Sequence, residues 1–264
     1  MNITVIAIIS ICTYLSSAFL IVQNINKNRA KQSATYFGWI GVCTHLIFIG
    51  LNFQLNTGFN FGFFNTGSLI AMIVALLLSI ASLNKPVETL GVAIFPIAAG
   101  MLALELNSPE NTQTLTQHNW AMSAHILTSI IAFSLLNIAA IQAILLAFQN
   151  QQLKSHPPKK IIQSLPPLQT MESLLFQMLT TGIIFLTISL GTGFLFIEDL
   201  FAQHLVHKTV LSLLAWIIFT GLLLGRNFYG WRGLTAIKWT LVGFLLLLLA
   251  YFGSKLVLEL ILHR

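Results

Sequence analysis

The sequence is dominated by long apolar stretches that are separated by short polar connections. A helix needs about 20 mostly apolar residues to cross the hydrocarbon core of a bilayer. Eight stretches approach or exceed this length: 3–22, 36–56, 67–83, 87–106, 121–148, 171–196, 208–224 and 239–259. Because backbone N–H and C=O groups must be satisfied within the protein where no water reaches them, each stretch is predicted to be a transmembrane helix. We therefore expect an all-α, polytopic bundle of about eight transmembrane helices that forms a single integral membrane domain over residues 1–264.

Charged residues are too scarce for a soluble protein. Only 8% of the 264 residues are charged and 56% are hydrophobic, whereas a soluble domain contains about 25% charged residues. The net charge of +6 would by itself suggest a nucleic-acid partner. The basic residues, however, lie in alternate connections and not on one soluble surface. The expected partner is therefore the lipid bilayer, and nucleic-acid binding is excluded.

The distribution of lysine and arginine predicts the orientation in the membrane. Ten of the 13 basic residues lie in the first, third, fifth and seventh connections: Lys27, Arg29, Lys31, Lys85, Lys154, Lys159, Lys160, Arg226, Arg232 and Lys238. The other three, Lys208, Lys255 and Arg264, lie at span ends on the opposite side. Cytoplasmic connections carry the excess of basic residues in membrane proteins. Both termini are therefore predicted to lie on the side away from the cytoplasm.

The longest connection, 149–170, contains four of the seven prolines in a polar and basic context. Proline-rich segments favour extended conformations without internal hydrogen bonds. We expect this segment to be an extended cytoplasmic connector between two four-helix halves.

Acidic residues are few and lie near the predicted span ends. Glu88 and Glu172 stand at cytoplasmic span starts, whereas Glu105 and Glu259 lie toward the outer ends. An ionisable group at the middle of the bilayer would be a functional candidate by default. The sequence offers no chain of such carboxylates, which argues against a small-solute or ion permease.

Two histidines stand near the outer ends of two predicted spans. His125 lies about one turn inside the fifth span, and His207 lies in the first turn of the seventh, so we expect both at a similar depth. Two neutral imidazoles on facing helices can bind the two sides of a haem iron, as in b-type haem sites. Each could instead be an ordinary interfacial polar residue. A zinc site formed by His118, His204 and His207 is a further alternative.

His45 is a separate case, because it lies ten residues into the second predicted span and close to the middle of the bilayer. Two interpretations are open for it. It is either a ligand of a second, deeper haem or a polar side chain that hydrogen-bonds across helices.

Three stretches resemble the cytochrome c assembly family, which includes CcmC, CcsA and HemX-like proteins. They are SAHILTSIIAFSLLNIAAIQAILLAFQ (123–149), HKTVLSLLAWIIFTGLLLGRNFYGWRG (207–233) and KWTLVGFLLLLLAYFGSK (238–255). The resemblance is closest to the YpjD-type branch, and His125 occupies the position of the family's haem-binding histidine. It implies non-covalent haem b on the periplasmic side of a bacterial inner membrane and a connection with cytochrome c maturation.

The chain departs from the family pattern in one segment. Members that deliver haem carry a tryptophan-rich outer loop before the penultimate span, whereas FLFIEDLFAQHLVHKT (194–209) has no tryptophan. Their second outer histidine would lie near the last span, where this chain has Tyr251, Ser254 and Lys255. His207 is therefore an inferred partner of His125, and is not carried over from the family.

These observations together predict a haem-binding inner-membrane protein. It would hold or relay haem near the periplasmic face through axial ligation of the iron by His125 and His207, with His45 as a candidate ligand of a second haem. It is not expected to be an enzyme, because bis-histidine ligation leaves no open coordination site on the iron. Partners would be the bilayer, haem and cytochrome c maturation or other membrane proteins. The main alternative is an accessory or regulatory subunit that keeps the fold without delivering haem.

Overall fold

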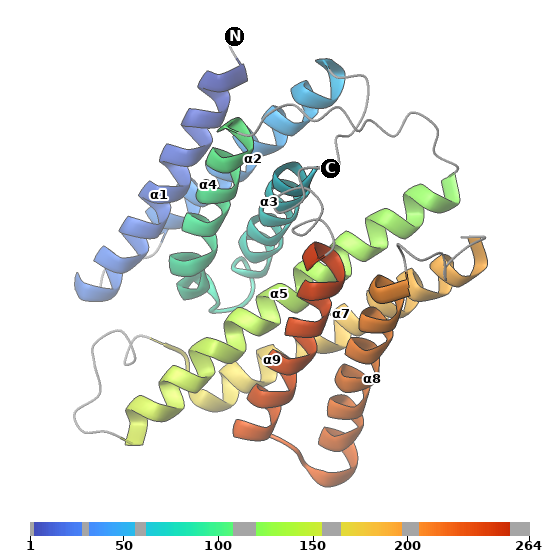
Figure 1. Ribbon diagram of the computed structural model, residues 1–264. Helices are drawn as coiled ribbons and strands as arrows, with labels where there is room; N and C mark the ends of the chain where they lie inside the picture. The colour runs from blue at the N-terminus through green and yellow to red at the C-terminus, as the bar shows by residue number, and fades with distance from the viewer. Residues whose placement is uncertain are drawn as a thin grey trace. The chain divides into compact units, whose positions relative to one another are not determined.

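A computed structural model describes residues 3–27, 32–55, 62–107, 120–154, 165–196 and 206–253 (Figure 1). Within these ranges the chain is helical, with no strand. The elements in chain order are α1 (Ile3–Lys27), α2 (Gln32–Leu55), α3 (Phe63–Ala81), the 3₁₀ turn η1 (Glu88–Leu90), α4 (Gly91–Asn107), α5 (Trp120–Lys154), α7 (Leu168–Phe196), α8 (Val206–Tyr229), α9 (Leu234–Leu248) and the π turn η2 (Leu249–Gly253).

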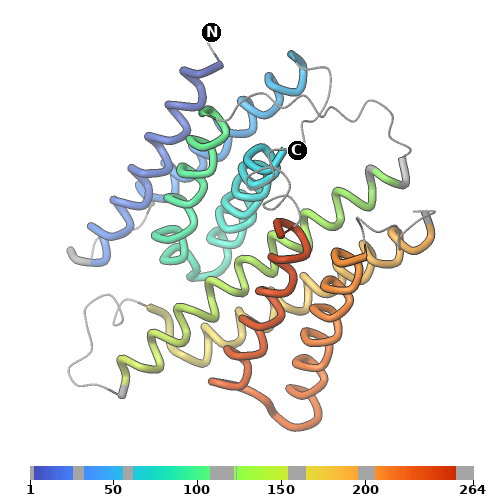
Figure 2. Tube along the Cα trace, viewed as in Figure 1, coloured from blue at the N-terminus to red at the C-terminus, as the bar shows by residue number. Residues whose placement is uncertain are grey.

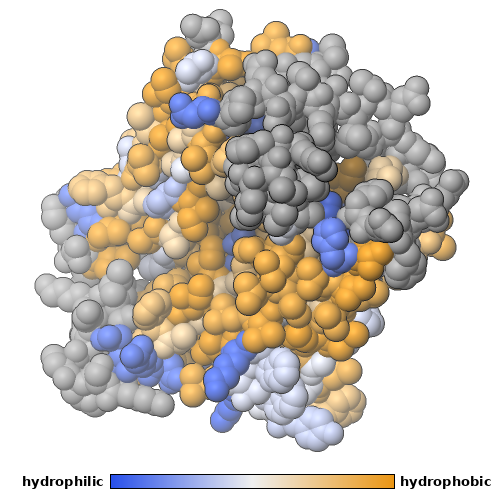
Figure 3. Space-filling model, in the orientation of Figure 1, coloured by the Kyte–Doolittle hydropathy of each residue, from blue (hydrophilic) through white to orange (hydrophobic). Residues whose placement is uncertain are grey.

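The described helices confirm the predicted all-α membrane fold. Eight of them are long and apolar enough to span a membrane. Their bounds follow the predicted spans closely. Over the described ranges the largest differences are five residues, as at the start of the last span, which lies at residue 234 and not at 239. The predicted end of that span, residue 259, lies outside the described residues. Large apolar side chains such as Phe19, Leu195 and Ile217 are exposed, and apolar residues dominate the face drawn in Figure 3. Such extensive apolar surface is typical of lipid-facing helices.

The chain divides into two compact units. One contains Met1–Thr116 with Pro157–Pro166, and the other contains Gln117–His156 with Pro167–Arg264. The described helices α1 to α4 belong to the first unit, and α5, α7, α8 and α9 belong to the second. The prediction that 149–170 joins two four-helix halves is therefore wrong, because α5 and α7 on either side of it pack together in one unit. The four-helix halves are instead divided between α4 and α5.

In the first unit, α1 packs against α2 and α4, and α3 packs against α4 and α2 (Figure 2). Polar contacts reinforce this packing at the α1–α2 interface. The hydroxyl of Ser10 donates to the Gly41 carbonyl at 2.8 Å, and that of Ser17 donates to the Ala34 carbonyl at 2.7 Å. Hydrogen bonds between helices are a main source of association in a membrane, where lipid is as apolar as the side chains.

In the second unit, α5 packs along α7, and α8 packs against both α7 and α9. Small residues allow the close approach of α5 and α7, because a Cβ added to Gly182 would lie 2.9 Å from the Leu136 side chain. Trp216 of α8 donates its indole N–H to the Thr187 hydroxyl of α7 at 2.8 Å. These contacts set both α5 and α8 against α7, the helix between them in this unit.

The turn between α8 and α9 is held by two glycines and an aromatic stack. Gly230 and Gly233 have positive φ values of 67° and 61°, which glycine adopts at low cost. The N–H of Gly233 donates to a carboxylate oxygen of Glu172 on α7 at 3.1 Å. The ring of Trp231 stacks on Trp239 at an interplanar angle of 7°. The turn thereby fixes the angle at which α9 returns along α8.

The Trp231 ring also packs directly on Gly225 of α8, where an added Cβ would overlap ring atoms. We expect Gly225→Ala to lower the stability of the purified protein by about 1–3 kcal/mol, because the stacked ring cannot move away freely. Gly221→Ala is the matched control, since its Cβ would meet no atom within 4 Å. Thermal unfolding in detergent, followed by size-exclusion chromatography after heating, would measure the difference. Equal stability of the two variants would contradict the packing described.

Candidate functional site

The imidazole of His125 lies between α5 and α7 and is held by one of its ring nitrogens. Its Nδ1 atom lies 2.9 Å from the backbone carbonyl oxygen of Ser189, and the side chain is partly buried. A carbonyl oxygen can only accept a hydrogen bond, so Nδ1 carries the hydrogen in this contact. In the neutral ring, Nε2 then has a free lone pair. This is the arrangement that orients histidine ligands in metal sites, where the second nitrogen donates to a carbonyl or carboxylate.

Hydroxyl groups surround this contact on both helices. The hydroxyls of Ser129 and Ser189 lie 2.7 Å apart, and Ser129 also donates to the His125 carbonyl. Thr192 places its hydroxyl 3.4 Å from Nδ1 of His125. Tyr251, from the π turn that follows α9, makes a side-chain hydrogen bond with Ser129. Elements α5, α7 and η2 therefore meet next to His125.

A glycine on α7 makes room for the His125 ring. A Cβ added to Gly193 would lie 3.1 Å from Cε1 and 3.3 Å from Nδ1 of His125. With any side chain at this position, the imidazole would have to move by a few tenths of an ångström. Gly191, two residues earlier, faces open space instead.

Sequence reasoning did not identify these supporting residues. Ser129 follows His125 by one helical turn, and Gly193 follows Ser189 by one turn. Each spacing is visible in the sequence. The pairing of the two helices that brings the four residues together is not.

His207 lies in the first turn of α8, and its side chain is exposed. The first turns of α5 and α8 and the last turn of α7 lie at the same end of the second unit (Figure 1). His125 and His207 are thus on two helices that both pack against α7. No hydrogen bond of His207 to another described residue is present.

The zinc alternative falls largely on residues that are not described, because His118 and His204 lie outside the described ranges. Among the residues that the structure does describe, no group of three or more His, Cys, Asp or Glu side chains is arranged to hold a metal ion.

His45 is fully buried in the first unit, and both of its ring nitrogens are occupied. Its Nε2 lies 3.0 Å from the hydroxyl of Ser68 on α3, and its Nδ1 lies 3.4 Å from the hydroxyl of Tyr14 on α1. The Tyr14 ring also meets the imidazole edge to face, with ring centroids 5.9 Å apart. This side chain hydrogen-bonds across three helices, which is the second of the two interpretations that the sequence left open.

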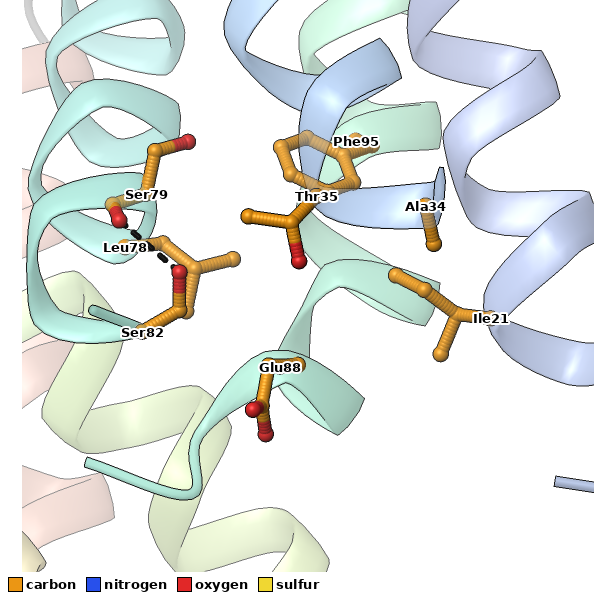
Figure 4. Close-up of a pocket in the computed structure, with 8 residues that line it drawn as sticks. All are labelled: Ile21, Ala34, Thr35, Leu78, Ser79, Ser82, Glu88 and Phe95. Atoms are coloured by element: carbon orange, nitrogen blue, oxygen red, sulfur yellow. Dashed lines mark hydrogen bonds between the residues drawn. The ribbon is translucent and has the colours of Figure 1, made fainter. Parts of the chain in front are cut away.

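The first unit also contains a cavity of about 250 Å³, including space open to solvent (Figure 4). Its polar lining comes from Thr35, Ser79, Ser82 and Glu88. The space enclosed in this cavity is only about 10 Å³, which is room for about one water molecule, so a haem does not fit here. The hydroxyls of Ser79 and Ser82 donate to backbone carbonyls of their own helix, at 2.8 Å each. The cavity is therefore not a haem site.

Comparison with known proteins agrees with this helical membrane architecture. The family model described as "Cytochrome C assembly protein" matches residues 32–262. Among curated proteins, the chain is 31% identical to "Inner membrane protein YpjD" of Escherichia coli K12 over 263 residues, which cover 97% of this chain and 99% of that protein. It is 34% identical to a 28.8 kDa protein of Azospirillum brasilense over 140 residues, or 52% of each chain. No solved structure matches.

The family model covers most of the chain, including all the residues that surround His125. The relative from Escherichia coli matches over nearly the full length of both proteins and is named as an inner membrane protein. The predicted location in a bacterial inner membrane agrees with that name and with the eight candidate spans. The chain is an integral membrane protein and belongs to the cytochrome c assembly protein family.

Proposed function

We propose that the protein binds haem b non-covalently at the periplasmic end of its second unit, with His125 as an axial ligand, and holds or relays it for cytochrome assembly. This proposal rests mainly on the orientation of the His125 ring. Its Nδ1–H donates to the Ser189 carbonyl at 2.9 Å, which leaves Nε2 as a lone-pair donor. Bound haem would supply a redox-active iron, which two histidines would hold without an open position for other ligands.

His207 is the proposed second ligand. Its exposed side chain is accessible to a large ligand, and α8 lies against the same helix, α7, that orients His125. The segment 197–205 between α7 and α8 lies outside the described ranges. It carries no tryptophan, so haem retention suits this chain better than the delivery attributed to tryptophan-rich members.

The periplasmic position of the site follows from the proposed orientation. Ten of 13 basic residues lie in connections on the opposite side, and these connections are cytoplasmic by the positive-inside rule. Both termini and the His125 end of α5 are then periplasmic.

A second candidate function is that of an accessory or regulatory subunit that has kept the fold without haem. The stretch without tryptophan is the observation that favours it. The two functions differ in one measurable property, which is whether the purified protein contains haem.

Replacement of the ligands tests the site directly. From cells well supplied with haem, protein purified in mild detergent should give a b-type signal in reduced-minus-oxidised spectra. We expect His125→Ala to abolish this signal and His207→Ala to reduce it strongly. His45→Gln is a control in the other unit and should retain the signal, because both ring nitrogens of His45 already have protein partners. If the purified wild type contained no haem, the haem-binding proposal would be wrong and the accessory function would be supported. If His45→Gln lost half of the haem, the protein would bind a second haem at His45.

The space beside His125 offers a test that keeps both histidines. Gly193→Ala would press a methyl group against the imidazole, at 3.1 Å from Cε1. We expect this variant to shift the haem absorption bands or to lose haem, because the ring must tilt away from its carbonyl partner. Gly191→Ala, on the same helix and facing open space, should bind haem as the wild type does. If Gly193→Ala had an unchanged spectrum and haem content, His125 would not be the ligand in this geometry.

A further inference from the structure

In the first unit, four helices each contribute one polar side chain to a connected group inside the apolar bundle. Tyr14 of α1, His45 of α2 and Ser68 of α3 each have a relative exposure of 0%. Glu105 of α4 is the fourth member and is partly buried. Ionisable residues inside a membrane are rare and usually functional. This group is independent of the haem site proposed for the second unit.

Hydrogen bonds connect the four residues in a single chain. The Tyr14 hydroxyl lies 3.4 Å from Nδ1 of His45, and Nε2 of His45 lies 3.0 Å from the Ser68 hydroxyl. The carboxylate of Glu105 receives side-chain hydrogen bonds from Ser68 and from Asn52 of α2. The chain therefore runs from the middle of α1 through α2 and α3 to the last turn of α4.

The ionised form of Glu105 fixes the direction of every hydrogen bond in this chain. A carboxylate can only accept, so Ser68 donates its hydroxyl hydrogen to Glu105. The Ser68 oxygen then accepts the Nε2–H of His45. Neutral His45 consequently has an unprotonated Nδ1, which accepts the Tyr14 hydroxyl hydrogen. All donors point toward the carboxylate.

Proton uptake at Glu105 weakens the hydrogen bond that its side chain accepts from Ser68. One proton binds to one carboxylate oxygen, no other covalent bond changes, and the other oxygen can still accept the Ser68 hydrogen. Hydrogen bonds to an ionised group are about twice as strong as those between neutral groups. The contact that joins α3 to α4 is therefore stronger when Glu105 is ionised.

The position of Glu105 gives it access to protons from one end of the bundle. It lies two residues before the end of α4 at Asn107. Nearby, Leu102 of α4 packs with Ile6 of α1 and Phe48 of α2, so this end holds the N-terminal part of α1. In the orientation proposed above, this is the periplasmic end. Tyr14 and His45 lie deeper, near the middles of their helices.

Few other titratable groups lie on the helices that pack around this chain. Over their described ranges, α3 carries none and α4 carries only Glu105. The remaining groups on α1 and α2 are Cys12, Lys27, Tyr36 and Cys43, besides Tyr14 and His45. Lys27, the one basic residue among them, ends α1 at the opposite end of the bundle. The charge of Glu105 is therefore stabilised by hydrogen bonds and not by an adjacent cation of these helices.

We propose that Glu105 is a proton-binding site, with Ser68 and His45 as positioning residues that hold a donor toward its ionised form. Reversible binding of one proton there couples the protonation of the periplasmic end to the contacts among α1, α2, α3 and α4. A purely structural group of polar side chains would take up no proton at the pH values at which the protein is folded.

Infrared difference spectroscopy of the purified full-length protein, recorded as the pH is changed, tests this proposal. The wild type should develop a carboxylic-acid C=O band from Glu105 that shifts in D₂O, besides the bands of its other Asp and Glu side chains. Glu105→Gln should lose the band, because the nearly isosteric amide cannot take up the proton. Glu88→Gln, which changes the glutamate at the other end of the α4 region, should retain it. Absence of the band in the folded wild type, or its persistence in Glu105→Gln, would refute the proton site.

The role of Ser68 is tested by the midpoint of the same infrared titration. Ser68→Ala removes a donor to the ionised carboxylate, and hydrogen bonds to a charged group are stronger than those between neutral groups. The midpoint of the infrared titration should therefore move by about one pH unit or more toward higher pH, with the band still lost in the double variant with Glu105→Gln. A midpoint equal to that of the wild type would show that Ser68 and His45 do not position the site. Size-exclusion profiles at each pH establish that the variants compared are folded.

Discussion

The hydrocarbon core of a bilayer offers no hydrogen-bond partners, and the rest of this structure depends on that constraint. Backbone groups satisfy it by forming helices, which accounts for the eight candidate spans. Polar side chains within the spans must find their partners on the same helix or on a neighbouring one. Ser10 and Ser17 do so by bonding from α1 to carbonyls of α2. The polar residues of α1 therefore contribute to its pairing with α2.

The histidines His45 and His125 satisfy the same constraint in different ways. His45 has a protein partner for each ring nitrogen and contacts α1 and α3. His125 uses Nδ1 for a carbonyl of α7, and its Nε2 has no hydrogen-bond partner among the described residues. An imidazole with one satisfied nitrogen is already oriented and keeps a donor atom for an external ligand. The family membership of the chain and this geometry both support His125 as the proposed haem ligand.

Each compact unit contains one polar group of this kind. The Tyr14–His45–Ser68–Glu105 chain belongs to the first unit, and the hydroxyls around His125 belong to the second. They suit different chemistry. The first ends in a carboxylate that accepts a hydrogen bond from Ser68, and this carboxylate can bind a proton. The second has an imidazole lone pair beside a glycine, which suits a metal-bearing ligand such as haem.

The sequence by itself determined the number and approximate bounds of the spans, because hydrophobic length is a local property of the chain. It also identified His125, through a family pattern contained within one span. It could not assign the partners of His45 or His125, since Ser68 and Ser189 lie 23 and 64 residues away and meet them only through helix packing. For the same reason it placed the division of the chain in the proline-rich connection, although α5 and α7 pack together. Only the tertiary structure decided which ring nitrogens the protein itself occupies, because hydrogen bonds between helices depend on how the helices are paired.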